Sequence, residues 1–290
     1  MRAVPKQPGE RSAVEIRRGN VVPAVFCVHS STGGVAEFVA LSAQLGEGQR
    51  FYGLQSPGLL DGDAPLRTVE ELAASYLGEV RALQPAGPYL FAGWSMGGYV
   101  AVELARQAAA AGLEVGGVFL IAPPYDEPWS WRRARKETRA ARRHLQELGD
   151  RIAAAAAPPG KQLLPQWDLN DDPLRDPAGH AATGPDAVLR WRAERVNVVN
   201  RWASGRYRTA LKRGTRPYDG RVVLFVPDGD PAGTTRRALA QWRAVLRTEP
   251  EVVTVPGEHL TVIVGPGARA VGARLKDEIA GPSWPEEAVS

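Results

Sequence analysis

A serine lies between two glycines in the stretch "LFAGWSMGGYVAVELA", residues 90–105. Gly93, Ser95 and Gly97 match the pattern G-x-S-x-G, with a short apolar run before it and a helical pattern after it. This combination is typical of a sharp strand-to-helix turn, where flanking side chains would clash and the serine hydroxyl projects above a sheet. Ser95 is therefore predicted to be a nucleophile, and the alternative is an ordinary loop serine. The backbone N–H of Met96, at the helix start, is predicted to stabilise an oxyanion.

A serine hydroxyl needs a base, and the chain contains four histidines. In the order serine, acid, histidine that α/β-hydrolases use, the histidine comes late in the chain. Only His180 and His259 lie far enough past the serine, and His259 is the predicted base because it follows the last predicted strand. His29 precedes the serine and is predicted to shape the loop over residues 30–34. A backbone N–H of that loop would be the second oxyanion donor, and Ser31 is the predicted residue.

Short apolar runs alternate with helical patterns along most of the chain. Strands are predicted over residues 21–28, 50–56, 88–93, 115–122, 221–227 and 251–257. Helices are predicted over residues 38–46, 68–85, 96–111, 234–247 and 267–280. Thr68 and Glu71 form a capping box at the start of the second helix. The alternation predicts an α/β fold with a mostly parallel sheet that helices cover on both faces.

The alternation stops between about residues 124 and 216, which are rich in Arg, Ala, Trp and Pro. Long insertions after a core strand usually cover a site. One domain over residues 1–290 is therefore predicted, with an N-terminal extension over residues 1–20 and a lid insertion over about residues 124–216.

Composition narrows the class of protein. The chain has 290 residues, of which 44% are hydrophobic and 23% charged, enough for a sizeable core. The single cysteine, Cys27, excludes an internal disulfide and fits a cytoplasmic location. No secretory signal and no run of 18 apolar residues is visible, so no membrane span is expected. We expect no cofactor and no metal, and the initial methionine and missing carrier domain favour a free-standing protein.

Five stretches resemble the thioesterase domains that end nonribosomal peptide and polyketide synthetases. They are "FCVHSSTGGVAEFVALSAQL", "FYGLQSPGL", "TVEELAASYL", "QPAGPYLFAGWSMGGYVAVELARQ" and "RPYDGRVVLF". The similarity covers residues 23–125 almost continuously and resumes near residues 216–226 and at His259. The resemblance implies an α/β-hydrolase fold with a helical lid and a Ser–His–Asp triad. It also implies that acyl chains are released from the phosphopantetheine of a carrier protein by hydrolysis or cyclisation.

One position departs from that family. The strand after the serine helix usually ends in the acid, but here the matching residue is Ala122, which cannot orient a histidine. One alternative is Asp126, four residues beyond the strand end. The other is the loop "VPDGDPAGT" after the next strand, where Asp230 is the first choice and Asp228 the second. The acid would fix the imidazole tautomer and stabilise its protonated form. A surface turn is the other interpretation of this loop.

A basic segment stands out within the predicted lid. The net charge is +4, and seven basic side chains fall between residues 132 and 143. Because carrier proteins are typically acidic, this segment is predicted to steer a carrier protein, and a solvated helix face is the alternative. No nucleic-acid motif accompanies the charge, so no nucleic-acid partner is expected. Five tryptophans either line an acyl tunnel or pack the lid on the core: Trp129, Trp131, Trp167, Trp191 and Trp202.

The resulting hypothesis is a serine thioesterase that forms an acyl-serine intermediate and transfers the acyl group to water or to an internal nucleophile. Two alternatives remain open from the sequence. One is an acyltransferase or cyclase with an acceptor other than water. The other is a catalytically impaired protein that only binds acyl or carrier groups, for which Ala122 is the sequence support.

Overall fold

The computed structural model describes residues 12–60, 64–124, 185–212, 217–230 and 233–281. The chain divides into two compact units, one formed by Met1–Asp126 with Val196–Ser290 and the other by Glu127–Arg195. Everything described below belongs to the first unit, apart from the first eleven residues of one helix that begins in the second.

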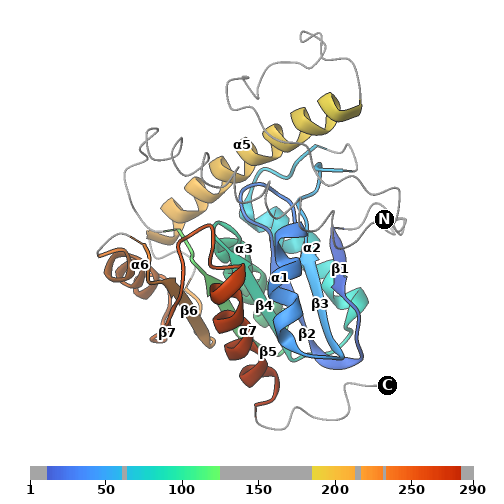
Figure 1. Ribbon diagram of the computed structural model, residues 1–290. Helices are drawn as coiled ribbons and strands as arrows, with labels where there is room; N and C mark the ends of the chain where they lie inside the picture. The colour runs from blue at the N-terminus through green and yellow to red at the C-terminus, as the bar shows by residue number, and fades with distance from the viewer. Residues whose placement is uncertain (1–11, 61–63, 125–184, 213–216, 231–232, 282–290) are drawn as a thin grey trace. The chain divides into compact units, whose positions relative to one another are not determined.

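A seven-stranded sheet forms the centre of the first unit (Figure 1). The strands are β1 (Ala13–Arg17), β2 (Val21–Val28), β3 (Gln49–Leu54), β4 (Tyr89–Trp94), β5 (Val115–Ile121), β6 (Val222–Pro227) and β7 (Glu251–Val255). They lie in the order β1-β3-β2-β4-β5-β6-β7. Only the β1–β3 pair is antiparallel among the described strands, so the predicted mostly parallel sheet is confirmed. The sequence predicts no strand before Val21, yet the short stretch "AVEIR" pairs as the edge strand β1.

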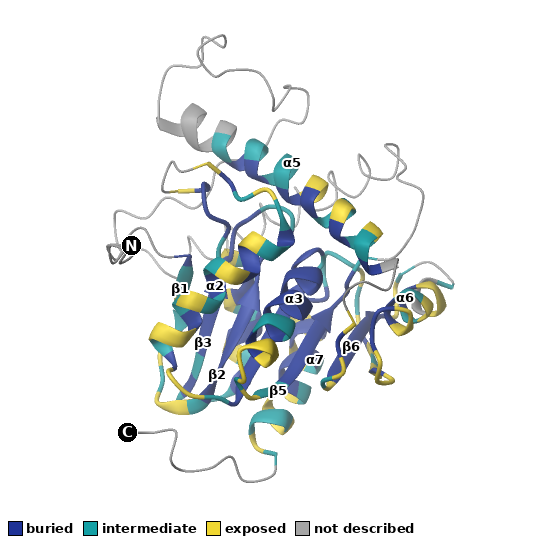
Figure 2. Ribbon diagram, turned by 180° about the vertical axis from the view of Figure 1, so that it is seen from behind, coloured by how far each residue is buried: buried dark blue, intermediate teal, exposed yellow. Residues whose placement is uncertain are grey.

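Helices cover both faces of this sheet, as predicted (Figures 1 and 2). They are α1 (Val39–Ser42), α2 (Val69–Leu83), α3 (Gly97–Ala110), α5 (Pro185–Lys212), α6 (Thr234–Arg243) and α7 (Gly265–Ile279). Helices α2 and α3 pack together on one face, and α1 and α7 pack together on the other. The capping box of α2 is present, because the Thr68 hydroxyl accepts the Glu71 N–H at 3.1 Å. None of the helices within the described ranges is long and apolar enough to cross a bilayer.

The central strands are apolar along their whole length because helices bury both of their faces. All six residues of β4 and all six of β6 are buried. Parallel strands present their carboxyl ends at one edge of the sheet, and an open α/β sheet binds ligands there. Ser95 follows β4 at this edge, Ala122 follows β5, Asp228 follows β6, and the loop to His259 follows β7.

Helix α5 packs on the core of the first unit from Val196 onward. Its buried residues recur every three or four positions, as expected for one face of a helix: Val196, Asn200, Ala203, Tyr207 and Leu211. Figure 2 shows buried and exposed residues on different sides of the helix. Trp202 is 51% exposed, and the Arg206 guanidinium lies 4.8 Å from the centre of its ring. The sequence predicts no helix over these residues, which it assigns to the lid insertion.

Candidate active site

The turn after β4 holds Ser95 in a conformation that a side chain rarely adopts. Its φ angle is 53°, in the left-handed region that costs about 1–2 kcal/mol for a residue with a Cβ. A Cβ on Gly93 would lie 2.2 Å from the carbonyl oxygen of Gly97, and one on Gly97 would lie 2.4 Å from that of His29. Both flanking glycines are therefore required by close backbone approach. The Ser95 N–H donates to the Ile121 carbonyl at 3.0 Å, which ties the turn to the end of β5.

His259 reaches the serine from the loop after β7. Its Nε2 lies 3.0 Å from Oγ of Ser95, within hydrogen-bond distance for a base and its nucleophile. The Trp94 indole N–H donates to the His259 carbonyl at 3.0 Å, so the residue before the serine also holds the histidine backbone. The structure thus brings together the predicted nucleophile and the predicted base, which are 164 positions apart in the sequence. Proton transfer between them is geometrically feasible.

Four hydrogen bonds join the loop after β6 to the last residue of β7 and to the loop that follows it. The Asp228 N–H donates to the Val255 carbonyl at 2.9 Å, and the Gly229 N–H donates to the Gly257 carbonyl at 2.8 Å. The Gly257 N–H donates to Oδ1 of Asp228 at 3.0 Å. The His259 N–H donates to Oδ1 of Asp230 at 3.0 Å. These bonds place the histidine and the two candidate aspartates in one connected structure.

The two aspartates of this loop differ in what they contact. The exposed Asp228 accepts a backbone N–H two residues before the histidine, whereas the half-buried Asp230 accepts the backbone N–H of His259 itself. Asp126, the third candidate acid, lies outside the described residues. Of the two described aspartates, Asp230 is thus the one bonded to the histidine residue itself, and a contact of its carboxylate with the imidazole ring stays a prediction.

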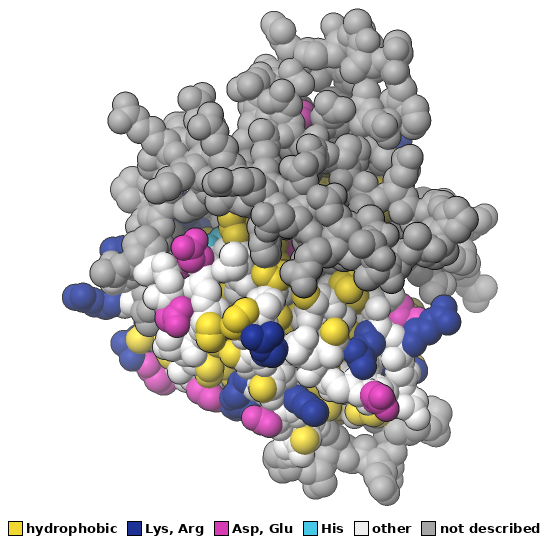
Figure 3. All heavy atoms as spheres, viewed as in Figure 1, with side chains coloured by type: hydrophobic (Ala, Val, Ile, Leu, Met, Phe, Trp, Pro, Cys, Tyr) yellow, Lys and Arg dark blue, Asp and Glu magenta, His cyan; other side chains and the backbone are white. Residues whose placement is uncertain are grey.

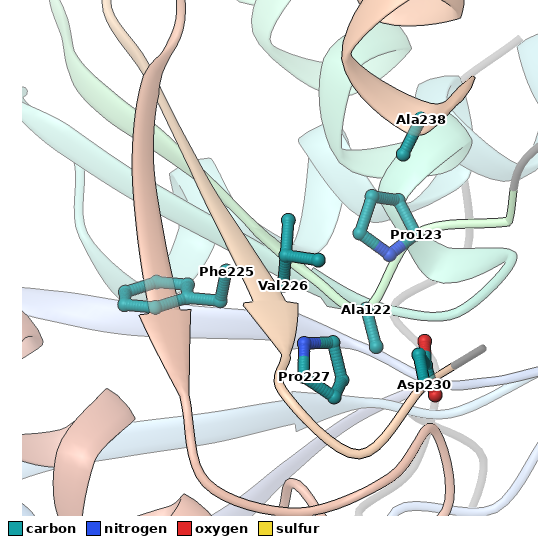
Figure 4. Close-up of a pocket in the computed structure, with 7 residues that line it drawn as sticks. All are labelled: Ala122, Pro123, Phe225, Val226, Pro227, Asp230 and Ala238. Atoms are coloured by element: carbon teal, nitrogen blue, oxygen red, sulfur yellow. The ribbon is translucent and has the colours of Figure 1, made fainter. Parts of the chain in front are cut away.

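Ala122 directly follows the last residue of β5 and has a φ angle of 41°, again in the left-handed region. It borders a small pocket at the carboxyl edge of the sheet (Figure 4). The pocket is lined by Ala122, Pro123, Phe225, Val226, Pro227, Asp230 and Ala238. Ala122, where the resemblance would place the acid, and Asp230, the predicted acid, thus border the same small space from the segments after the neighbouring strands β5 and β6.

The two predicted oxyanion donors also lie at this edge. Met96 is buried directly before the first residue of α3, where backbone N–H groups have no partner within the helix. Ser31 lies in the turn after β2, and the Gly33 N–H closes this turn on the Ser30 carbonyl at 3.1 Å. Gly33 has a φ of 83°, and a Cβ there would lie 2.5 Å from Cγ1 of Val196 in α5. The assignment of both N–H groups to an oxyanion stays a prediction.

His29 is completely buried beneath this turn and is bonded at both ring nitrogens. Its Nδ1 contacts the Ser30 carbonyl, which can only accept, so Nδ1 carries the proton. Its Nε2 lies 2.8 Å from the Tyr76 hydroxyl. Burial lowers the pKa of His29 to about 4, so the ring is neutral near pH 7. These contacts support the predicted role of His29 in shaping the loop.

Glu37 lies near the same turn, and the sequence does not single it out. The Thr32 hydroxyl donates to Oε1 of Glu37 at 3.4 Å, and the Ser30 hydroxyl lies 3.0 Å from that of Thr32. Burial raises the pKa of Glu37 to about 7, and the hydrogen bonds from these hydroxyls offset part of that shift. One carboxyl near the predicted oxyanion loop therefore changes charge near neutral pH.

Two asparagines of α5 contact the oxyanion loop and were not predicted. Nδ2 of Asn197 lies 3.3 Å from Oγ of Ser31, and Nδ2 of the fully buried Asn200 lies 3.4 Å from the Ser31 carbonyl oxygen. The sequence signal that could have identified Asn200 is a polar residue among the apolar positions of one helix face. That signal can be recognised only after the helix itself has been predicted.

Other predicted features of the site cannot be placed. The basic segment over residues 132–143, His180, Trp129, Trp131 and Trp167 lie outside the described residues, as does the side chain of Trp191. On the described part of the face shown in Figure 3, basic and acidic side chains are interspersed. Among the described residues, no group of three or more His, Cys, Asp or Glu side chains gathers as metal ligands would.

Comparison with curated proteins finds relatives among large synthetases. The chain is 40% identical over 101 residues to the polyketide synthase PksR of Bacillus subtilis, which is 35% of this chain and 4% of that protein. It is 30% identical over 254 residues to the nonribosomal peptide synthetase apvA of Aspergillus terreus, which is 82% of this chain and 26% of that protein. The chain therefore spans only a small part of the curated relatives that it matches.

Solved structures show the same fold. The NocB thioesterase domain, in covalent complex with a fluorophosphonate nocardicin G analogue, is 25% identical with a TM-score of 0.60, over 89% of this chain and 95% of that one. YbtT, a type II thioesterase from the yersiniabactin pathway, is 19% identical with a TM-score of 0.62, over 96% of this chain and 100% of that one. The predicted α/β-hydrolase-like fold is thereby confirmed.

The family model of the thioesterase domain matches residues 23–172, just over half of the chain. This match starts at β2 and includes the turn that carries Ser95, and the histidine lies beyond its end. The chain belongs to the thioesterase domain family and is homologous to the thioesterase domains of polyketide and nonribosomal peptide synthetases.

Proposed function

We propose that the protein releases an acyl chain from the phosphopantetheine thioester of a carrier protein through an acyl-serine intermediate. The observation that carries this proposal is the 3.0 Å separation between Ser95 Oγ and His259 Nε2, on a strained turn, in a chain of the thioesterase family. A serine hydroxyl in hydrogen-bond contact with an imidazole is the arrangement that activates a nucleophile.

The proposed reaction has two halves. His259 takes the hydroxyl proton as the Ser95 oxygen bonds to the thioester carbonyl carbon, and the Met96 and Ser31 N–H groups stabilise the oxyanion. The carbon–sulfur bond then breaks, and the departing thiol takes the proton from the imidazole. In the second half, His259 takes a proton from the acceptor, the acceptor bonds to the acyl carbon, and Ser95 regains the proton as its ester bond breaks. The chemistry uses side chains and backbone alone and needs no cofactor.

The acceptor in the second half is water or a nucleophile within the acyl chain. Several relatives belong to multidomain synthetases, and one structural neighbour, YbtT, is a type II thioesterase. A carrier protein is therefore the proposed partner, and the basic segment over residues 132–143 is its proposed contact. Asp230 is the proposed acid, since its carboxylate already accepts the backbone N–H of His259.

The test measures turnover of an acyl-pantetheine thioester by the release of free thiol. Mass spectrometry then identifies the acyl product. Replacing Ser95 by alanine is expected to abolish turnover and labelling by a fluorophosphonate. Replacing Ser204 by alanine is the matched control, because its hydroxyl bonds the Arg201 carbonyl of its own helix, away from Ser95. Unchanged turnover in the Ser95→Ala variant would refute the proposal. The mass of the product distinguishes a free acid from a cyclised chain.

The impaired-protein alternative receives no support from the described geometry. Its basis in the sequence is Ala122, yet Asp230 borders the same pocket from the loop after the neighbouring strand β6. Rapid labelling of Ser95 by the fluorophosphonate would exclude it.

A further inference from the structure

Two peptide groups flank Ser31, and each is held by a fully buried side chain. The peptide that joins Ser30 to Ser31 presents its carbonyl oxygen to Nδ1 of His29 and to the Gly33 N–H. The peptide that follows Ser31 presents its carbonyl oxygen to Nδ2 of Asn200 at 3.4 Å. His29 and Asn200 both have 0% exposure. The orientation of Ser31 is therefore determined from both sides.

The direction of the Ser31 N–H follows from the first of these peptides. In a trans peptide the carbonyl and the N–H point in opposite directions. Because the Ser30 carbonyl points toward His29 and Gly33, the Ser31 N–H points away from them. The second peptide shares the Cα atom of Ser31 with the first, so a displacement of the second peptide shifts the Cα next to this N–H and with it the position of the N–H. The amide of Asn200 opposes that displacement.

Helix α5 is closely fitted to this loop. A Cβ on Gly33 would lie 2.5 Å from Cγ1 of Val196 and 2.9 Å from Cβ of Ser56. Nδ2 of Asn200 also lies 3.5 Å from Oγ of Ser56, whose N–H donates to the Gly33 carbonyl at 2.9 Å. Asn200 therefore lies where three segments meet: the turn after β2, the loop after β3, and α5.

The chemistry of Asn200 is not that of a packing residue. Its Oδ1 is buried and has no hydrogen-bond partner within the described part of the chain. Burying an unpaired amide oxygen costs free energy that an apolar side chain of the same size would avoid. Unlike an apolar side chain, the Asn200 amide donates a hydrogen bond to the Ser31 carbonyl.

We infer that Asn200 is a positioning residue that acts from helix α5 to orient the Ser31 N–H toward the oxyanion. The inference rests on the proposed function, because it assumes that Ser31 donates to the tetrahedral intermediate formed on Ser95. Asn197 assists by donating to the Ser31 hydroxyl at 3.3 Å.

The test replaces Asn200 by leucine, which has a similar shape and no donor. Turnover of an acyl-N-acetylcysteamine thioester is measured, together with inhibition by a trifluoromethyl ketone analogue that binds as an oxyanion. Loss of a whole oxyanion donor costs about 10²- to 10³-fold, so a misdirected donor is expected to lower kcat by about ten-fold. KM is expected to change by less than about two-fold, and the inhibition constant should rise by the same factor as kcat/KM falls.

A matched control lies two turns along the same helix. The Tyr207 hydroxyl donates to the buried carboxylate of Glu103 at 2.7 Å, and Arg106 bonds that carboxylate as well. Tyr207→Phe removes an anchor of α5 without touching the loop, so it should lower thermal stability and leave kcat and ketone affinity unchanged. An equal loss in this control would overturn the inference, because it would assign the effect to helix docking in general.

The inference also fails if Asn200→Leu keeps its kcat and its affinity for the ketone. If this variant does not fold, Asn200→Asp provides the same readouts, because its carboxylate repels the Ser31 carbonyl. Ser95→Ala is assayed alongside. Turnover that survives in Ser95→Ala overturns the proposed function, whereas turnover lost there and kept in Asn200→Leu overturns only the role of Asn200.

Discussion

Replacing Asp230 by asparagine separates two roles of its carboxylate. The asparagine oxygen can still accept the His259 N–H, which Oδ1 of Asp230 now accepts at 3.0 Å. The loop also keeps its other bonds, including the one from the Gly257 N–H to Asp228. The variant therefore retains the position of the histidine backbone and removes the negative charge beside it.

The expected loss of kcat depends on whether Asp230 acts as the acid of the triad or only holds the backbone of His259. Losing the acid of a Ser–His–Asp triad slows turnover by about 10⁴-fold. That factor corresponds to about 5 kcal/mol of transition-state stabilisation, at about 1.36 kcal/mol for each ten-fold change. Losing one backbone hydrogen bond would cost only about 1 kcal/mol of folding stability. Asp230→Asn is therefore expected to lower kcat by about 10³- to 10⁴-fold while its melting temperature stays close to that of the parent.

The assay is steady-state turnover of an acyl-pantetheine thioester, with thermal unfolding measured on the same samples. Asp228→Asn is the matched control, because it makes the same chemical change two residues away. Asp228 is exposed and bonds Gly257 rather than the histidine. We expect its kcat to stay within about three-fold of the parent, since it supplies no charge to the imidazole.

A kcat above one tenth of the parent value in Asp230→Asn would refute the reasoning. It would mean that Asp230 only fixes the backbone of the loop and that the acid lies elsewhere. An equal loss in Asp228→Asn would refute it as well, because the two aspartates would then act through loop structure alone.

Two further predictions concern Ala122 and Glu37. In an Asp230→Ala background, Ala122→Asp is expected to raise kcat/KM by at least about ten-fold. The reason is that both positions border one pocket and that aspartate tolerates the left-handed backbone of position 122. A folded double variant whose kcat/KM does not recover contradicts this prediction. Burial raises the pKa of Glu37 from 4.5 to about 7. Its contribution to stability is therefore complete below pH 4.5 and is lost as the pH rises to about 7. Melting temperatures measured across this pH range should fall less in Glu37→Gln than in the parent, because the variant has no carboxyl to ionise. Curves of melting temperature against pH that run parallel for parent and variant would contradict the prediction.

Much of the fold could be predicted because the parallel strands are continuous apolar runs bounded by helices. The turn at Ser95 could be predicted for a related reason, since close backbone approach permits only glycine at Gly93 and Gly97. The pairing with His259 followed from the chain order of such sites. Each of these features depends on a local pattern or on the order of elements, and both are visible in a sequence.

The remaining features depend on contacts between distant segments. Strand β1 has five residues, all partly or fully exposed, so its apolar pattern is weak. Helix α5 carries the polar Asn200 within its buried stripe, which interrupts the apolar repeat by which a helix is recognised. The sequence leaves three candidate acids, Asp230, Asp228 and Asp126, because the choice depends on which carboxylate reaches the histidine from a distant segment; of the two described ones, only Asp230 accepts the His259 backbone N–H.

The four hydrogen bonds that join the loop after β6 to the end of β7 and the loop after it have a consequence for motion at the site. The imidazole and the carboxylate proposed to assist it are carried on one joined structure, whereas the hydroxyl is carried by the turn after β4. The Trp94 indole also joins this structure to the strand before Ser95, through its bond to the His259 carbonyl. A displacement of the two loops away from β4 therefore has to stretch that bond together with the contact between Oγ of Ser95 and Nε2 of His259, whereas the Asp230–His259 backbone bond moves with the loops. The indole bond thus limits how far the nucleophile and its base can move apart.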